Sequence, residues 1–392
     1  MATPQTVIVT GGRAPAALDA VRAFGRAGWR VVVAESEPRP LAAASRWSSR
    51  LVRVPPPRQR PAAFVQALAD LARASDADVV LPTCEEVFTV AWGRGAIGAA
   101  GACVLAPPLG VLRRLHDKAA FADLARSLGL DAPETARATS PDTLAEAVAA
   151  LRQRHGRVVT KPAFSRFGAD VNLDASPDAA RRLDVRPDRP WLAQAFVPGR
   201  ALCSYAVAHT GRVTAHAAYR TPFTAGAGAG VAFEPVRSAG ALAFARRIAR
   251  ATGATGQLAF DFQERADGRL SAVECNPRAT SGLHLFGPED DLVGALLGTA
   301  EGVVEPSTGR PVALRVALAL VGWRPGRTAE WRRWLRAARD PVATPDDPGP
   351  GRRQIASSAR LLARAARLGV SPLAASTHDI AWDGRDLGPP PS

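Results

Sequence analysis

Lysine is almost missing from this chain of 392 residues. Of the 50 basic residues only Lys118 and Lys161 are lysines, and all the others are arginines. Arginine thus occupies the positions where any surface cation would serve, which suggests that a retained lysine supplies a compact point charge instead of a planar fork. Lysine binds phosphate oxygens in this way. The two lysines are candidates for an anion site, with two ordinary surface lysines as the alternative.

Cysteine is scarce too, and long apolar runs are absent. Four cysteines, at positions 84, 103, 203 and 275, show neither a CxxC pair nor metal-ligand spacing, and each lies in or beside an apolar run. The first residues lack a basic segment and lead directly into a strand pattern, so we expect no signal peptide. No apolar run reaches the roughly 20 residues that span a bilayer. These absences predict a reduced, cytoplasmic protein that does not enter a membrane.

The charge of the chain is strongly positive, with a formal net charge of +14. The arginines are scattered along the sequence and do not cluster on a stretch with interleaved aromatic residues, so we do not expect a nucleic-acid partner. Small anions such as nucleotide phosphates would be attracted by the same positive field. The net charge alone identifies no partner.

Strand and helix patterns alternate over residues 1–112. The run Thr6–Val9 is followed by a Gly-Gly turn and by apolar residues at helical spacing, and Val31–Ala34 begins a second strand. Val79–Leu81 and Cys103–Leu105 are further strand candidates. This order predicts an α/β domain with a parallel, Rossmann-like sheet, and the chain length favours two or three domains.

The pattern changes after residue 112. Residues 113–200 begin with two helices and continue with a strand at Arg157–Thr160, and residues 201–305 consist mainly of strands broken by glycines. We expect residues 113–305 to form an α+β domain.

Residues 306–392 predict a C-terminal extension. We expect a strand at Val312–Leu320, a Trp-rich helix at Thr328–Arg339, a mobile loop at 340–351 and a basic helix at Arg352–Leu368. The helices are expected to pack on the body of the chain, or on a second copy in a homodimer, in preference to a membrane. The last five residues, from Gly388, are expected to be disordered.

The strongest local signal is a hairpin that opposes two acids. Asp267-Gly268 has the composition of a two-residue type I′ turn, and the register counted outward from it places Asp261 opposite Glu274. Asn276 shares their face of the ladder. Opposed like charges destabilise a sheet, so a cation between them is favoured, such as Mg²⁺ bridging nucleotide phosphates. The alternatives are two solvated acids, or a bulge that breaks the pairing.

Residues 1 to about 300 resemble the ATP-grasp superfamily, specifically the carboxylate-amine ligases of its carbamoyl-phosphate-synthase-like branch. The motifs follow in the expected order: a Rossmann-like pre-ATP-grasp domain, the helix start LHDKAAF, the strand and loop VVTKPAFSRFG, the hinge QAFVPG and the hairpin FDF…ECNPRATSGLHLF. The resemblance implies an ATP-grasp domain at 113–305, composed of a linker helix with a nucleotide-covering subdomain (113–200) and a metal and substrate subdomain (201–305).

The resemblance also implies roles for particular residues. The lysines bind the nucleotide phosphates, a short loop covers them, the hinge backbone binds adenine, and Arg278 stabilises an acyl-phosphate and its transition state. The implied nucleotide ligands are Lys118, Lys161, Ser165, Gly168, Gln194, Ala195, Phe196 and Val197, and the implied metal ligands are Asp261, Glu274 and Asn276.

Arg220 follows a strand and is a candidate for bidentate binding of a substrate carboxylate, with a structural ion pair as the alternative. Together these features predict an ADP-forming ligase that joins a small-molecule carboxylate to an amine. We expect it to use ATP and two Mg²⁺ ions, which Mn²⁺ could replace. Three alternatives stay open. They are a bicarbonate-activating carboxylase or carbamoyl-phosphate-type enzyme, an NAD(P)-dependent oxidoreductase built on the TGG turn, and a nucleotide-binding scaffold without turnover. The last is suggested by Ala201, which stands where many members of the family carry an acid for the ribose.

Overall fold

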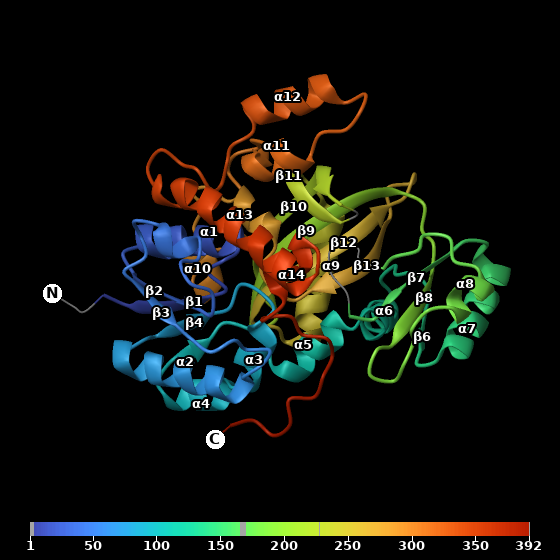
Figure 1. Cartoon of the computed structure of the whole chain (residues 1–392), viewed down its shortest axis with the longest axis horizontal. Helices are drawn as coiled ribbons and strands as arrows, with labels where there is room; N and C mark the ends of the chain where they lie inside the picture. The colour runs from blue at the N-terminus through green and yellow to red at the C-terminus, as the bar shows by residue number, and fades with distance from the viewer. Residues whose placement is uncertain (1–3, 165–169, 227, 392) are drawn as a thin grey trace.

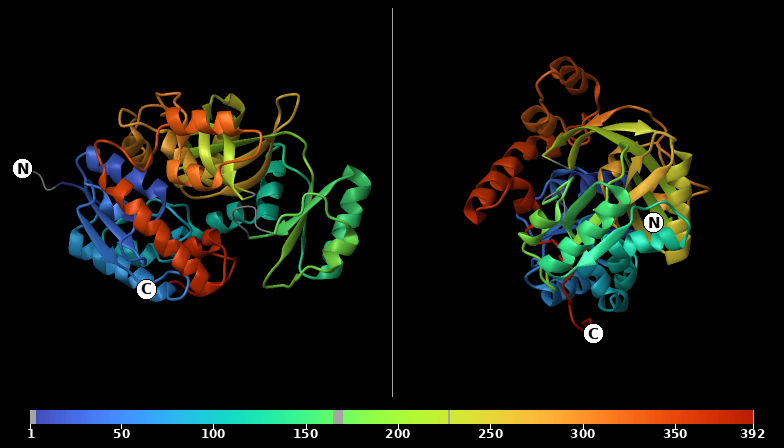
Figure 2. Two further views of the ribbon diagram at one scale, coloured as in Figure 1. Left: turned by 45° about the horizontal axis from the view of Figure 1, so that its top comes forward. Right: turned by 90° about the vertical axis from the view of Figure 1, so that its right-hand side faces the viewer.

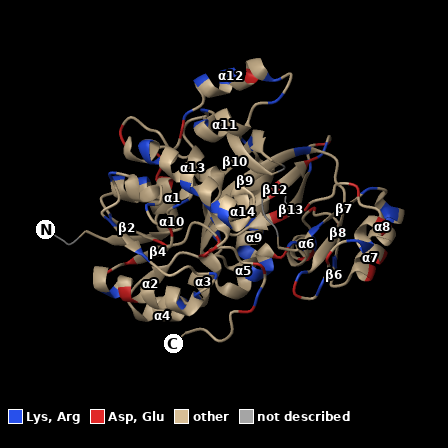
Figure 3. Ribbon diagram, viewed as in Figure 1, with Lys and Arg blue, Asp and Glu red and all other residues tan. Residues whose placement is uncertain are grey.

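The computed structural model describes residues 4–164, 170–226 and 228–391. The chain folds around three β-sheets (Figure 1), one with five strands, one with six and one with three. Lysines and arginines are distributed over the ribbon from the N-terminal part to α8 and α12 and do not gather in one region (Figure 3). None of the helices in the described ranges combines the length and the apolar composition that a membrane span requires.

The five-stranded sheet is parallel throughout, in the order β3-β2-β1-β4-β5, as predicted. Successive side chains of β1 point to opposite faces, so Val7 and Val9 pack on the side of α1 while Ile8 packs on the side of α2. The elements are β1 (Thr6–Thr10), α1 (Pro15–Arg26), β2 (Arg30–Glu35), the 3₁₀ helix η1 (Ala42–Ala44), β3 (Arg50–Arg53), α2 (Pro61–Ser75), β4 (Val79–Leu81), α3 (Val87–Trp92), α4 (Arg94–Ala99) and β5 (Cys103–Val104).

The three-stranded antiparallel sheet has the order β6-β8-β7 and is reached through two helices, α5 and α6. It stands at one end of the molecule with α7 and α8 on its outer side (Figures 1 and 2). The elements are α5 (Leu109–His116), α6 (Lys118–Ser127), β6 (Thr135–Ala138), α7 (Pro141–His155), β7 (Val158–Pro162), α8 (Pro177–Arg181) and β8 (Trp191–Ala195).

The six-stranded sheet, in the order β13-β12-β9-β10-β11-β14, is the centre of the molecule. Alternate residues of β9 divide its two faces: Tyr205 and Val207 pack toward α1 and α10, whereas Ala206 and Ala208 pack toward α6 and α9. The elements are β9 (Arg200–His209), β10 (Arg212–Ala225), β11 (Ala229–Val236), α9 (Ala239–Thr252), β12 (Gly256–Glu264), β13 (Leu270–Asn276), the 3₁₀ helix η2 (Ser281–Leu285), α10 (Leu292–Leu297) and β14 (Val312–Ala313).

The C-terminal extension corrects two sequence predictions, the strand at Val312–Leu320 and the mobile loop at 340–351. The strand predicted at Val312–Leu320 is wrong beyond β14, because α11 (Arg315–Val321) follows immediately, and a short apolar run does not distinguish strand from helix by its periodicity. The remaining elements are α12 (Thr328–Ala337), α13 (Gly349–Leu368) and α14 (Pro372–Thr377). Trp334 of α12 packs on Phe223 of β10, so this helix rests on the body of the chain.

The segment 340–351, predicted to be a mobile loop, is packed. Arg22 of α1 is 3 % exposed and donates to Asp347 Oδ2 at 2.9 Å and to the carbonyl of Val342 at 3.0 Å. Trp92 Nε1 donates to the carbonyl of Gly388 at 3.0 Å, and the disorder predicted for the last five residues stays a prediction. The prediction of a mobile loop at 340–351 was wrong because composition shows flexibility in isolation and not the buried donors that a segment meets in the fold.

Candidate active site

The β12–β13 hairpin brings Asp261 opposite Glu274, as predicted, but its turn is different. Arg265 N–H donates to the carbonyl of Arg269 at 2.9 Å, which leaves a three-residue loop with Gly268 at φ 81°. A type I turn followed by a glycine in the left-handed region is the usual three-residue hairpin connection. The predicted two-residue type I′ turn is therefore wrong.

A β-bulge at Val273 restores the predicted pairing. Beside the turn, Phe262 pairs with Ala272 and not with Val273, one residue away from the register counted from the sequence. The extra residue, Val273, then shifts the ladder back, so that Asp261 pairs with Glu274 and Phe260 with Cys275. The unexpected turn and the bulge each shift the register by one residue, in opposite directions. The pairing predicted for Asp261 and Glu274 is therefore correct.

Asn276 completes this polar face. Its Nδ2 lies 3.4 Å from Asp261 Oδ2 and 3.3 Å from Glu274 Oε1, while its Oδ1 accepts from Arg278 at 3.4 Å. The amide therefore has to rotate by half a turn before Asn276 can offer an oxygen to a cation beside the two carboxylates. Phe260 and Phe262, on the opposite face, are buried.

The two acids differ in their electrostatics. Burial, and next the negative charge of Glu274, raise the pKa of Asp261 above its usual value. Burial acts in the same direction on Glu274, but the charges of Lys118 and Lys161 outweigh it and lower the pKa of Glu274. Glu274 is thus a carboxylate whose charge is compensated by the two lysines, whereas the charge of Arg278 lowers the pKa of Asp261 too little to outweigh burial and Glu274.

This donor set fits Mg²⁺. Two carboxylates and one amide are oxygen donors of the kind that Mg²⁺ takes together with substrate oxygens and water, and the opposed pair is relieved by a positive ion. Within residues 4–164, 170–226 and 228–391, no group of three or more His, Cys, Asp or Glu side chains is arranged to hold a metal.

Both lysines of the chain reach this face. Lys118, at the start of α6, is 3 % exposed and its Nζ lies 3.6 Å from Glu274 Oε2. Lys161, on β7, is 7 % exposed and donates to the Oε1 of Gln194 at 2.9 Å and to the carbonyl of Val273 at 3.4 Å. Two buried ammonium groups from two elements therefore converge beside one carboxylate.

Arg278 links the hairpin to the first sheet. Its guanidinium lies 3.6 Å from Glu85 Oε1, and Glu85 follows the carboxyl end of β4, the edge where open parallel sheets bind ligands. Arg220 is placed differently: it forms an ion pair with Glu264 at 2.5 Å and donates to the carbonyl of Ala201 at 3.2 Å. Its guanidinium is engaged in a structural pair, so the predicted role in binding a substrate carboxylate would require that pair to open.

Known proteins resemble this structure in fold. No family model matches the chain, and no curated protein matches it in sequence. An N5-carboxyaminoimidazole ribonucleotide synthetase in complex with ADP superposes with a TM-score of 0.60 and 16% identity, over 79% of this chain and 81% of that chain. The L-amino acid ligase from Bacillus licheniformis gives 0.57 and 14%, over 79% of both chains. The biotin carboxylase domain of the Hydrogenobacter thermophilus 2-oxoglutarate carboxylase gives 0.55 and 13%, over 71% of this chain and 65% of that chain.

The chain has the ATP-grasp fold. The fold predicted from the sequence motifs is thereby confirmed. At identities of 16% and below, the likeness establishes the fold, and the reaction has to be argued from the site.

Of the hinge residues predicted to bind adenine, Gln194 to Val197, several already have hydrogen-bond partners within the protein. Gln194 uses its side chain to bind Lys161 and Thr135. The N–H groups of Ala195 and Phe196 donate to the carbonyls of Glu134 and Arg157, both at 2.9 Å. Among the described residues, Val197 N–H donates to no protein acceptor, so of the three N–H groups from Ala195 to Val197 it is the one that is not already engaged. Ser165 and Gly168, predicted to cover the phosphates, lie outside the described residues.

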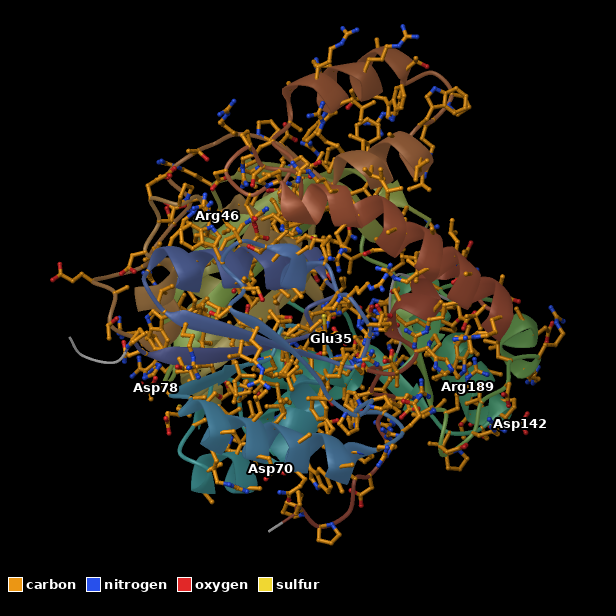
Figure 4. All side chains as sticks on the ribbon, turned by 60° about the vertical axis from the view of Figure 1, so that its left-hand side comes forward. Glu35, Arg46, Asp70, Asp78, Asp142 and Arg189 are labelled. Carbon is orange, nitrogen blue, oxygen red and sulfur yellow. The ribbon has the colours of Figure 1, made fainter. Side chains whose placement is uncertain are left out.

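Sequence reasoning missed the part that the C-terminal extension plays around the site. Glu35, at the end of β2, lies in the middle of the molecule beside the C-terminal helices (Figure 4). Arg13 donates to Glu35 Oε1 at 2.5 Å and to Asp379 Oδ1 at 2.6 Å, and Trp382 N–H donates to Glu85 Oε2 at 3.2 Å. The only signal in the sequence was a tryptophan within a polar, glycine- and proline-rich tail, which indicates a docked segment.

Proposed function

We propose that this protein is an ATP-dependent ligase. It phosphorylates a substrate carboxylate with the γ-phosphate of ATP, releases ADP, and lets an amine attack the acyl-phosphate to give an amide and phosphate. The observation that carries the proposal is the convergence of Lys118 and Lys161 on Glu274, directly opposite Asp261. A buried site with two ammonium groups and two facing carboxylates suits a triphosphate with its metal ions and few other ligands.

The residues of the chain would act by position and charge, which supply most of the catalysis in phosphoryl transfer. Lys118 and Lys161 would hold phosphate oxygens, and Asp261, Glu274 and the rotated amide of Asn276 would hold Mg²⁺. Mg²⁺ when bound supplies charge neutralisation at the phosphates. Arg278, between the metal ligands and Glu85, is placed to stabilise negative charge on the substrate carboxylate as it accepts the phosphoryl group.

The groups around the site do not favour covalent catalysis by the enzyme. Burial, and next the charge of Glu86, raise the pKa of Cys84 to about 12, so its thiol is not ionised at neutral pH. Burial, followed by the charge of Lys118, lowers the pKa of His116 to about 3, which keeps that imidazole neutral. The proposed reaction needs neither a nucleophile nor an imidazolium acid from the chain.

Activation of bicarbonate is a second candidate, because two of the similar structures are an N5-carboxyaminoimidazole ribonucleotide synthetase and a carboxylase domain described with bicarbonate. Release of ADP with bicarbonate alone, without any dependence on an organic acid, would favour it. The oxidoreductase alternative is less well supported. Glu35, the acid after β2 that a dinucleotide ribose would require, is bonded by Arg13 and lies 2 % exposed.

The test is a screen of carboxylate and amine pairs for ADP release with Mg²⁺. Once a pair is found, Glu274→Ala and Lys161→Ala should abolish ADP release while circular dichroism and the unfolding transition stay close to wild type. Glu234→Ala, an exposed residue on β11, is the matched control and should retain full activity. Near-wild-type turnover in either site variant would refute the assigned roles.

A further inference from the structure

The last part of the chain lies across the boundary between the first sheet and the helices that lead to the nucleotide-covering part. After α14 it runs past α5 (Figure 1). It is attached along its length: Arg58 pairs with Asp383 at 2.9 Å, and Arg113 pairs with Asp386 at 3.2 Å. A segment held at several points in this way is part of the folded structure.

Trp382 is the centre of this attachment. Its ring is 5 % exposed and stacks on Phe88 of α3 at 4.4 Å between centroids, with 15° between the planes. It also contacts Phe164 edge-on at 5.3 Å and lies 5.9 Å from the ring of His116. Trp382 therefore joins the first sheet's helices to the end of β7.

The same residue holds a polar group of the site. Its backbone N–H donates to Glu85 Oε2 at 3.2 Å, and the other oxygen of Glu85 lies 3.6 Å from Arg278. The tail thereby helps to orient the carboxylate that faces the catalytic arginine.

Phe164 connects the tail to both lysines. The carbonyl of the preceding residue, Ala163, accepts from Lys118 Nζ at 3.4 Å, and Lys161 lies on the same strand end. Gly384 packs directly on the Phe164 ring, because a Cβ at this glycine would overlap it. The position of Phe164 therefore affects the position of the Lys161 ammonium group and of the Ala163 carbonyl at the end of β7.

We propose that Trp382 and Gly384 are positioning residues of the nucleotide site. Together they form the surface on which the Phe164 ring packs, which we call the seat. The seat fixes the end of β7, and with it Lys161 and the Ala163 carbonyl that binds Lys118. Trp382 also holds Glu85 near Arg278 through its backbone N–H. The inference rests on the proposed function in that the positioned lysines bind a nucleotide. Loss of the seat then weakens nucleotide binding without unfolding the chain, since displacement of a binding group by about 1 Å is costly.

The test compares two alanine substitutions in the tail. Gly384 and Gly388 have φ of 91° and 70°, so alanine is strained at both, but a Cβ at Gly388 meets no atom within 4 Å. We expect Gly384→Ala to weaken Mg·ADP binding, measured by calorimetry, by about tenfold, and Gly388→Ala to leave it within about twofold. Equal effects of the two substitutions, or unchanged binding in Gly384→Ala, would overturn the proposal.

A second pair of variants addresses Trp382 itself. Both variants keep the backbone donor to Glu85, but only Trp382→Phe keeps a ring against Phe164, so it should restore most of the affinity that Trp382→Ala loses, with KM for ATP moving more than kcat. Trp323→Ala, at a tryptophan that is 50% exposed, should change neither parameter. A loss in Trp382→Ala that phenylalanine does not rescue, with kcat and KM equally affected, would also count against a positioning role.

A readout without nucleotide separates this inference from the proposed function. With two lysines in the chain, selective ¹⁵N-lysine labelling gives two backbone amide signals. Gly384→Ala should shift the Lys161 signal and Gly388→Ala should not. If the wild type binds no Mg·ADP but these shifts occur, the proposed function fails and the seat stands. If Mg·ADP binds and Gly384→Ala leaves the Lys161 signal unmoved, the seat fails alone.

Discussion

Asp261 lies directly opposite Glu274, and the two lysines lower the pKa of Glu274. Lys118 approaches Glu274 to 3.6 Å, and Lys161 bonds to the carbonyl of the residue before it. The site therefore contains one neutralised acid and one acid whose ionisation is opposed by burial and by its neighbour. A divalent cation between the two carboxylates would stabilise the ionised form of Asp261. The arrangement therefore favours cation binding, whereas in the metal-free hairpin the two opposed charges are destabilising.

The first prediction concerns Asp261→Asn. Removing one of two opposed charges should leave the metal-free protein as stable as the wild type or more stable by up to about 1 kcal/mol. The thermal stabilisation by Mg·ADP should be largely lost, because one carboxylate ligand is gone. Asp267→Asn, at an exposed position in the same hairpin, should respond to Mg·ADP as the wild type does. An Asp261→Asn protein that gains as much from Mg·ADP as the wild type would exclude Asp261 as a ligand.

The second prediction follows from Lys161. Burial lowers the pKa of Lys161 to about 8, so its positive charge is present below that pH and is lost above it. The affinity for Mg·ATP should therefore fall as the pH rises through about 8, and binding should be accompanied by uptake of protons there. Calorimetry in buffers of different ionisation enthalpy measures both quantities. Lys161→Arg, which stays charged, should flatten the profile even if its planar fork binds more weakly. A flat wild-type profile would contradict the assignment.

Local signals carried most of what the sequence could predict. The parallel sheet follows from alternating patterns, and the acid pair follows from strand periodicity combined with turn composition. The pairing of Asp261 with Glu274 was nevertheless predicted through a wrong turn, and the bulge at Val273 corrected the register. The bulge at Val273 depends on packing across the sheet, and the residue type at this position does not predict it. Pairings counted outward from a turn are therefore unreliable beyond a few residues.

Contacts between distant segments were not predictable. The composition of 340–351 is that of a flexible loop, yet Arg22 of α1 holds it from the inside. No sequence pattern predicted the docking of the segment before Gly388, in which Trp382 packs between Phe88 and Phe164. Both segments are ordered by partners far away in the sequence, and composition contains no information about those partners.

The third prediction compares two arginines of α1. Arg22 and Asp347 are 3 % and 1 % exposed, so Arg22→Met leaves a buried carboxylate without its cation and should lower the free energy of unfolding by about 3 kcal/mol or more. Arg26, one helical turn away, pairs with Asp346 at the surface, and Arg26→Met should cost less than about 1 kcal/mol. Urea unfolding at neutral pH measures the difference. Similar losses in the two variants would show that the buried pair does not fix the 340–351 segment.

The fourth prediction concerns the ion pair that docks the tail. Asp379 accepts from Arg13 Nη1 at 2.6 Å, from Ser36 Oγ at 2.7 Å and from Arg364 at 2.8 Å. Burial would raise the pKa of Asp379, but the hydrogen bond and charge of Arg13, and next the bond from Ser36, outweigh it and lower that pKa. A depressed carboxyl pKa contributes stability above its unfolded value, roughly pH 4, and the contribution is lost as the pH falls further.

Asp379→Asn should therefore destabilise the protein by about 2 kcal/mol at pH 7, because charge-assisted bonds to Arg13 and Arg364 are weakened. The gap between wild type and variant should narrow as the pH is lowered from about 5 toward 2, since in that range the Asp379 carboxyl of the unfolded chain takes up a proton while the folded carboxyl, with its lowered pKa, stays largely ionised. Asp383→Asn is the control, because Asp383 and its partner Arg58 are 48% and 34% exposed and that pair should contribute less than about 1 kcal/mol at either pH. A gap between wild type and Asp379→Asn that is independent of pH would mean that the loss comes from altered packing and not from the charge of Asp379.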